Sequence, residues 1–251
     1  MRYPGRLALD SRQVCLWTVR LEASEDNFRR CFSWLSPDET ARAERFRFPQ
    51  HRRAYILGRA ALRALLSGYL GSAIGQIQFI YGPQGKPSLA PEFHDVMCPL
   101  RFNASNSGDL AAYAFTTGCE IGVDIERYRA LPDLEKIARR FFAPQETAEL
   151  LELSSAEQPA AFFHCWTRKE AVIKALGGGL SIPLDSFQVT LRPGVAAGMV
   201  SLDGSSDAAR GWTLHSFDPA PDVAGAIAYA GEPREVQAGP VISVDHLLSD
   251  D

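Results

Sequence analysis

Cysteine is scarce in this sequence, and the placement of the few that occur argues against two kinds of site. The 251 residues include five cysteines, and no two of them form a C-x-x-C pair. An odd number without such spacing argues against a disulfide framework and a structural zinc site, and favours reduced thiols in a cytoplasm. The five are Cys15, Cys31, Cys98, Cys119 and Cys165.

Long hydrophobic runs are also missing, and neither sign of charge dominates. No stretch approaches the roughly 18 apolar residues of a membrane span, and the first residues lack the apolar segment of a signal peptide. The formal net charge of −4 gives no case for a protein that binds nucleic acid. With 46% hydrophobic and 22% charged residues, the composition is that of an ordinary globular protein, which we expect in the cytoplasm.

Arginine, by contrast, is concentrated in one stretch. Residues 42–63 hold seven arginines and one glutamate, in a chain whose acidic residues outnumber its basic ones. Such a stretch is either the solvated face of a helix or a binding site for phosphate groups. Both interpretations stay open at this point.

Helical and strand patterns alternate along the first half of the chain. Ser36, Pro37 and Glu39 form the capping box of a helix over 36–46, which we expect Pro49 to end. The other elements expected here are a strand over 14–22, a helix over 51–71 that stops at Gly68 or Gly71, and a strand with a loop over 77–90. They are followed by two strands within 101–128, joined as a hairpin at Thr117-Gly118.

The second half repeats this plan loosely. We therefore predict an α+β fold of two similar halves, residues 1–116 and 117–251, packed tightly around a cleft. We expect the last residues to form a short C-terminal tail with a frayed acidic end. The elements expected in the second half are a helix over 134–153 interrupted at Pro144, a helix over 157–176, a strand over 185–191 and an antiparallel pair over 211–218 and 223–231.

Two carboxylates share one face of a predicted strand. In the stretch 119–126, a strand period of two places three aliphatic residues on one face and Gly122, Asp124 and Glu126 on the other. The simplest interpretation is a solvent-facing edge that charge keeps soluble. Two neighbouring carboxylates repel each other unless a cation lies between them, however, and Mg²⁺, which prefers oxygen ligands, is the alternative.

A second charged group lies on the helix over 157–176. Trp166, Glu170 and Lys174 recur at i, i+4 and therefore share one face. The simple interpretation is a surface ion pair, which contributes about 0.3 to 0.5 kcal/mol. The aromatic residue at the start of this helix face suggests instead that the pair borders a buried region. Glu170 would then be a third carboxylate beside the two of the strand, and Lys174 would lie beside phosphates. The glycines 177–179 would end the helix and allow a close backbone approach.

Together these motifs resemble a known family. "GVDIE" at 122–126, followed by "WTRKEAVIK" at 166–174, looks like the paired signature of the 4′-phosphopantetheinyl transferases, of the larger, monomeric surfactin-synthetase type. The resemblance is specific because several separate motifs occur in the right order and spacing, and it covers most of the chain. The further motifs are "SPDETARAERFRF" at 36–48, "GKP" at 85–87, "FNASNSGD" at 102–109 and "GGGLSIPLDSFQV" at 177–189.

The resemblance implies a fold and a reaction. Such enzymes have two α+β halves related by a pseudo-two-fold, with the co-substrate coenzyme A in the cleft between them. They transfer 4′-phosphopantetheine from coenzyme A to a serine of an apo acyl or peptidyl carrier protein, with Mg²⁺ as cofactor, and release adenosine 3′,5′-bisphosphate. On this resemblance we expect a monomer with no nucleic-acid or membrane partner.

The resemblance also implies site residues. Asp124, Glu126 and Glu170 match the family's magnesium ligands, and Asp124, Glu170 and Lys174 match its catalytic residues. Lys174 would neutralise charge on the leaving phosphate, and Glu170 is the candidate base for the serine hydroxyl, directly or through a water molecule. The residues that match coenzyme A contacts are Arg42, Lys86, Asn103, Ser105, Asn106 and Lys174, with 103–106 in a loop around the nucleotide.

One position departs from the family pattern. A Ser-His-Ser sequence is replaced by Ser105-Asn106-Ser107, and asparagine keeps a hydrogen-bond donor but cannot carry a positive charge. We therefore expect retained activity with altered affinity for coenzyme A. Two alternatives to the transferase are a coenzyme A-binding module without chemistry and a magnesium-dependent nucleotide phosphohydrolase. Only the transferase needs a carrier protein as acceptor.

The residues that would contact a carrier protein are less clearly indicated by the sequence than the site residues. Arg168 and the helix after Arg139-Arg140 are candidate contacts for an acidic carrier. Lys169 points away from Glu170 on the same helix, so we expect it to be structural or to contact a partner. Both acyl and peptidyl carriers fit these residues.

Overall fold

The computed structural model describes residues 7–93 and 99–249. Cys98, expected as a reduced thiol, and the acidic end at Asp250 and Asp251 lie outside the described residues. The cysteines within the described ranges are all free. In these ranges, no helix combines the length and the apolar character needed to cross a membrane.

Helices and strands occur in runs along the described residues rather than in strict alternation. The first part contains β1 (Gln13–Arg20), α1 (Glu25–Phe32), α2 (Pro37–Glu44), α3 (Pro49–Leu70), β2 (Phe79–Tyr81), β3 (Pro87–Leu89), β4 (Leu100–Ser107) and β5 (Leu110–Thr117). The middle part contains β6 (Ile121–Arg127), α4 (Leu134–Phe141), α5 (Pro144–Glu152), α6 (Gln158–Leu176) and β7 (Phe187–Val189). The last part contains β8 (Met199–Leu202), α7 (Ser206–Ala209), β9 (Trp212–Ala220), β10 (Val223–Ala230), β11 (Glu235–Ser243) and α8 (Val244–Leu247).

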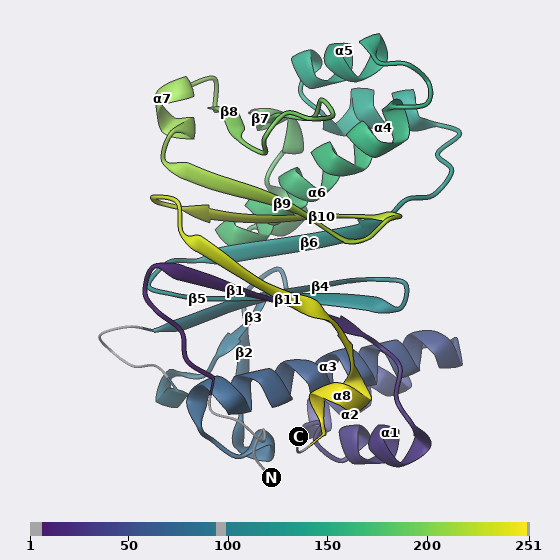
Figure 1. Ribbon diagram of the computed structural model, residues 1–251, viewed down its shortest axis with the longest axis vertical. Coiled ribbons are helices and arrows are strands. Elements are labelled where there is room, and N and C mark those ends of the chain that lie inside the picture. The colour runs from purple at the N-terminus through teal and green to yellow at the C-terminus, as the bar shows by residue number, and fades with distance from the viewer. Residues whose placement is uncertain (1–6, 94–98, 250–251) are drawn as a thin grey trace.

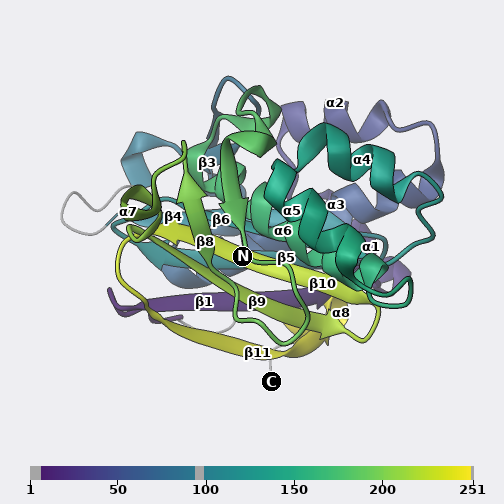
Figure 2. The ribbon, with the colours of Figure 1, turned by 90° about the horizontal axis from the view of Figure 1, so that it is seen from above.

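Two sheets face each other, and each carries a long helix on its outer face (Figure 1). The first sheet has the order β11-β1-β5-β4 and packs against α3, and the second has the order β6-β10-β9 and packs against α6. Seen from above, β9 and β10 lie over β1 and β11 of the sheet beneath them (Figure 2). This arrangement of two α+β halves confirms the predicted fold class.

Successive residues of a strand point alternately into two cores. The outer core lies between a sheet and its helix, and the inner core lies between the two sheets. On β5, Tyr113 and Phe115 pack with α3, whereas Ala112 and Ala114 face the second sheet. This is the period of two expected of a strand that is covered on both faces. It explains why β5 is buried along its whole length. The inner core joins the two halves.

The first helices begin where their sequence signals predict, but one boundary differs. The amide of Ser36 donates to Glu39 Oε2 at 3.0 Å, so the predicted capping box is present at the start of α2. Pro49 does not end that helix; it is the first residue of α3. Proline is favoured there because the first turn of a helix has no partner for an amide hydrogen. α3 ends at Gly71, the later of its two predicted stops, with φ of +66°.

The hairpin predicted at Thr117-Gly118 is wrong. β5 forms its hairpin with β4, and after Gly118 the chain crosses to the other sheet, where β6 pairs with β10. In this position the aliphatic face of β6 is buried against the first sheet, and the face with Gly122 lies against α6. If β6 had paired beside β5 in the first sheet, it could not have been buried against that sheet on one face and against α6 on the other.

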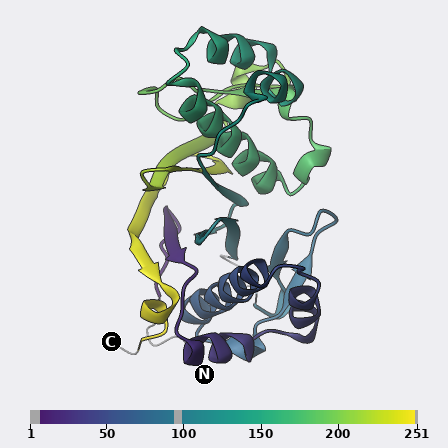
Figure 3. The same cartoon turned by 90° about the vertical axis from the view of Figure 1, so that its right-hand side faces the viewer.

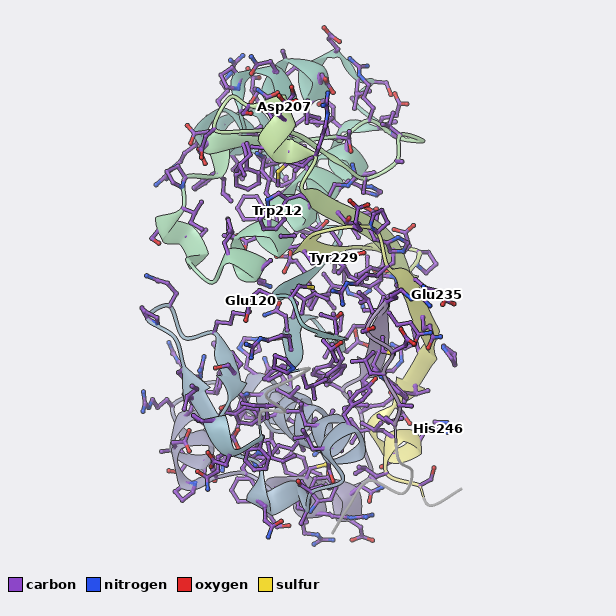
Figure 4. The ribbon with its side chains drawn as sticks, turned by 90° about the vertical axis from the view of Figure 1, so that its left-hand side faces the viewer. Glu120, Asp207, Trp212, Tyr229, Glu235 and His246 are labelled. Atoms are coloured by element: carbon purple, nitrogen blue, oxygen red, sulfur yellow. The ribbon has the colours of Figure 1, made fainter. Side chains whose placement is uncertain are left out.

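The segment expected to form a C-terminal tail is instead an ordered strand and helix. β11 pairs in parallel with β1, and α8 places Val244 and Leu247 in the core around α3. Figure 3 shows β11 running along one side of the molecule from the second half to the first. Figure 4 labels Glu235 at the start of β11 and His246 in α8. The division of the chain at residues 116 and 117 stays a prediction.

Five elements of the second half agree with the sequence. The helix interruption at Pro144 separates α4 from α5, and α6 spans almost the predicted range. Gly177 ends α6 with φ of +75°, as expected for the first residue of the glycine run. β9 and β10 form the predicted antiparallel pair.

Candidate active site

The candidate site lies where β6 meets α6, and Gly122 permits that contact. A β-carbon at this position would lie 1.9 Å from the carbonyl oxygen of Ala171 and 2.6 Å from the amide nitrogen of Ala175. Because both atoms belong to the backbone of α6, no side chain can move aside for it. Glycine at 122 therefore sets how closely α6 approaches β6. That spacing in turn sets the distance between Lys174 on α6 and Asp124 on β6.

Asp124 is buried and receives hydrogen bonds from two other elements. Its Oδ1 accepts from Lys174 Nζ at 2.6 Å and from Ser105 Oγ at 2.8 Å. Its Oδ2 is also buried but has no hydrogen-bond partner in the described part of the chain. Burial raises the pKa of this carboxyl group, and the charge of Lys174 opposes the rise. A buried carboxylate oxygen without a partner is costly, which indicates that a hydrogen-bond donor or a cation from outside the chain belongs beside it.

Glu126 lies two residues along the same face of β6, as the strand period predicts. Its Oε2 accepts a hydrogen bond from Ser107 Oγ at 3.1 Å and pairs with the guanidinium of Arg129 at 3.2 Å. Ser107 Oγ also accepts from the amide of Arg127 at 2.9 Å. This serine therefore fixes Glu126 and joins β4 to β6 at one point.

Glu170 brings a third carboxylate to the same place. It is half-buried on α6 and lines a cavity of about 380 Å³ together with Asp124, Glu126, Trp166 and Lys174. Burial raises the pKa of Glu170, the charge of Asp124 raises it further, and Lys174 lowers it. The predicted grouping of Glu170 and Lys174 on one helix face is confirmed by this shared cavity.

The three carboxylates suit a hard divalent cation in their chemistry. Within residues 7–93 and 99–249, no three His, Cys, Asp or Glu side chains are grouped closely enough to ligate a metal ion as they lie. Cations of the chain hold two of the carboxylates instead: Lys174 pairs with Asp124, and Arg129 pairs with Glu126. The unpartnered Oδ2 of Asp124 and the all-oxygen donor set fit Mg²⁺.

β4 supplies the polar side chains that face β6. Asn103 Oδ1 accepts from the amide of Val123 at 2.9 Å, and Ser105 and Ser107 follow at a spacing of two with bonds to the carboxylates of β6. The segment expected to be a nucleotide-binding loop is therefore a strand, because its backbone is paired with β5 along its whole length. Asn106 is exposed, unlike its neighbours.

Three adjoining cavities form one cleft beside the carboxylates. Ala104 lines all three, and their volumes are about 240, 400 and 380 Å³. Arg42 lines the first cavity, Lys86 the second, and Asn106 the first and the third. Residues predicted from separate motifs therefore meet along one cleft between α3, β4 and α6. Their contacts with coenzyme A stay predictions.

Lys86 links the two halves at the second cavity. Its Nζ donates to Glu120 Oε2 at 2.8 Å, to the carbonyl oxygen of Ile121 at 3.2 Å and to that of Ala175 at 3.5 Å. Glu120 lies at the level where the two halves meet (Figure 4). Since Ala175 belongs to the last turn of α6, Lys86 also places a positive charge at the negative end of that helix.

Two residues of the first cavity, Tyr55 and Arg59, were not singled out from the sequence. The Tyr55 hydroxyl is buried with no hydrogen-bond partner among the described residues. The guanidinium carbons of Arg42 and Arg59 lie 5.6 and 6.0 Å from the centre of its ring, and Arg59 pairs with Glu39 at 3.2 Å. The i, i+4 spacing of Tyr55 and Arg59 could have placed them on one helix face. Here the arginine-rich stretch borders the cleft rather than bulk solvent alone.

Lys169 and Arg168 lie away from the cleft. Lys169 is fully buried, pairs with Glu146 at 2.8 Å and donates to the carbonyl oxygens of Leu184 and Phe187 at 2.7 and 2.6 Å. This confirms the structural alternative for Lys169. The prediction that Arg168 contacts a carrier is wrong, because its side chain is buried and donates hydrogen bonds within the second half.

Comparison with known proteins agrees with this geometry in both halves. A family model described as the 4′-phosphopantetheinyl transferase superfamily matches residues 120–228, and one described as 4′-phosphopantetheinyl transferase, N-terminal, matches residues 20–118. The 4′-phosphopantetheinyl transferase HetI of Nostoc sp. is 39% identical over 91% of this chain and 92% of its own. The 4′-phosphopantetheinyl transferase Sfp of Bacillus subtilis is 35% identical over 67% of this chain and 71% of its own. The chain therefore belongs to the 4′-phosphopantetheinyl transferase family, and within it to the larger type that Sfp represents.

Proposed function

We propose that this protein transfers the 4′-phosphopantetheine group of coenzyme A to a serine hydroxyl of an apo acyl or peptidyl carrier protein. Adenosine 3′,5′-bisphosphate is the second product. The observation that carries the proposal is the meeting of Asp124, Glu126, Glu170 and Lys174 at one cavity of the cleft, in a chain of this family.

The cofactor we propose is Mg²⁺, held by Asp124, Glu126 and Glu170. The support is their all-oxygen donor set and the buried Oδ2 of Asp124, which has no partner among the described residues. When bound, the ion supplies positive charge that stabilises the phosphate oxygens during transfer.

Two side chains of the protein act on the reacting groups in this proposal. Lys174 neutralises negative charge, and Glu170 accepts a proton. Lys174 Nζ lies 3.1 Å from Ser105 Oγ and 2.6 Å from Asp124, so its ammonium group is fixed at the cavity, where it neutralises the leaving phosphate. Glu170 takes the proton of the attacking serine, directly or through a water molecule. In the ion-free protein, burial and the charge of Asp124 raise the pKa of Glu170, and a bound cation would oppose that rise.

The remaining cleft residues bind coenzyme A in this proposal. Arg42, at the first cavity, offers a positive charge to its phosphates, and Asn106 offers a neutral donor at a position where a histidine would carry charge. Lys86 lines the second cavity, beside Lys174. Asn103 and Ser105 shape the strand on which Asn106 lies.

Intact mass spectrometry of an apo carrier tests the proposal directly. Incubation with this protein, coenzyme A and Mg²⁺ should add the mass of one phosphopantetheine group to the carrier, and a chelator or Glu170→Gln should abolish the gain. Glu25→Gln is the matched control, because Glu25 is exposed on α1 and pairs with Arg53, and neither residue lines the cleft.

The same assay separates the alternatives. No mass gain on acyl and peptidyl carriers, with coenzyme A still bound, would favour a binding module and contradict the transferase. Release of nucleotide without any carrier would favour a phosphohydrolase.

We further propose that the protein works as a monomer in the cytoplasm, with its two halves divided near residues 116 and 117. The free cysteines of the described ranges are in keeping with a reducing compartment. Light scattering during gel filtration measures the oligomeric state, and a dimer mass would contradict the first part.

A further inference from the structure

Arg129 is a charged residue at the carboxylates that the proposed chemistry does not use. It follows the end of β6, and its guanidinium lies 3.2 Å from Glu126 Oε2. The guanidinium carbon also lies 5.4 Å from the centre of the ring of Phe163, which α6 supplies. An aromatic face attracts such a cation, so Arg129 is held on two sides although its side chain is 61% exposed.

The charges around the cavity show what Arg129 does to a bound cation. Asp124, Glu126 and Glu170 bring three negative charges, and Lys174 and Arg129 bring two positive ones. The ionised group therefore has a net charge of −1 with Arg129 and −2 without it. Because a divalent cation is attracted by this net charge and needs an oxygen of Glu126, Arg129 opposes its binding in two ways.

We propose that Arg129 competes with the divalent cation for Glu126 and thereby sets the affinity of the site, an inference that rests on the proposed metal ligands. In the ion-free protein Arg129 neutralises Glu126. When the cation binds, the guanidinium withdraws toward solvent. Ser107 keeps Glu126 in place in both states, because its hydroxyl donates to the carboxylate independently of Arg129.

The competition also has a consequence for partners. By linkage, any anionic group that draws Arg129 away from Glu126 tightens cation binding, and the cation in turn favours that group by the same factor. Arg129 would then connect occupancy of the metal site to the charge of whatever binds at the open side of the cavity.

Mn²⁺ binding to the full-length protein, without coenzyme A or carrier, tests the inference. Electron paramagnetic resonance measures free Mn²⁺ and gives the dissociation constant. Arg129→Gln should bind Mn²⁺ about two- to fivefold more tightly, the range expected when one exposed ion pair is removed. The gain should shrink at high salt, because salt screens exposed charges.

Two further variants make the result specific. Lys136→Gln removes the same charge from an exposed i, i+3 pair with Asp133 on α4 and should leave the dissociation constant unchanged. Arg129→Lys retains the positive charge and should restore a constant close to that of the unmodified protein. Melting curves establish that each variant is folded.

Several outcomes would overturn the inference. Equal or weaker Mn²⁺ binding by Arg129→Gln would show that Arg129 does not compete, and the metal ligands would stand. An equal gain in Lys136→Gln would make the effect one of overall charge. No Mn²⁺ binding by any variant would remove the metal site and this inference together, whereas transfer to a carrier is measured separately by mass.

Discussion

Replacing Gly122 with alanine tests whether the spacing between β6 and α6 controls the site. The added β-carbon would lie 1.9 Å from the Ala171 carbonyl oxygen, and real β-carbons essentially never approach within 3.0 Å. α6 must therefore recede by about 1 Å, since neither backbone can yield on its own.

That displacement acts on the contact between Lys174 and Asp124. Their 2.6 Å hydrogen bond lengthens to about 3.6 Å, which is no longer a hydrogen bond. A misplacement of this size costs about 100-fold in rate when it separates catalytic groups. The same overpacking costs about 1 to 3 kcal/mol of folding free energy. We therefore expect Gly122→Ala to lose activity far more than stability.

The assay combines the initial rate of carrier modification, followed by intact mass, with a thermal melt of each variant. Gly239→Ala is the matched control, because Gly239 also lies in a strand but has no atom within 4 Å of an added β-carbon. A folded Gly122→Ala protein whose rate stays within a few-fold of the control would refute the reasoning from helix spacing.

Two further substitutions test separate parts of the structure. Asn106→His should lower the KM for coenzyme A by roughly fivefold, because a charged donor strengthens a hydrogen bond to phosphate; an unchanged KM in steady-state kinetics would contradict this. Lys169→Met leaves Glu146 buried without its 2.8 Å partner and should cost about 3 to 5 kcal/mol in urea unfolding. Lys136→Met, at an exposed pair, is its control, and a comparably small loss for both would count against the buried pair.

The central part of the site could be predicted because it depends on local periodicity. A strand period of two places Asp124 and Glu126 on one face, and a helical spacing of four places Glu170 and Lys174 on another. Each pattern fixes only its own face. That the two faces meet was one of two open interpretations of the residues, which the family resemblance then favoured, and the structure accounts for it through the glycine at 122.

The contacts that the sequence did not predict join segments far apart in the chain. Ser107 reaches Glu126 and Lys86 reaches Ala175 only after β4, β6 and α6 are packed together. β11 escaped notice for a different reason: most of its residues are exposed, and Gly239-Pro240 is typical of a loop. Its place is determined by the free edge of β1 rather than by its own hydrophobic pattern.

The pairing of β11 with β1 has a consequence for how the chain is made. β11 pairs with β1, the first strand of the described residues, whereas β11 and α8 follow all the other described helices and strands. Until these two elements have been made, β1 has an open edge, and the core around α3 lacks Val244 and Leu247. The first half therefore cannot finish folding before β11 and α8 have been made, so the two halves fold as one unit rather than one after the other.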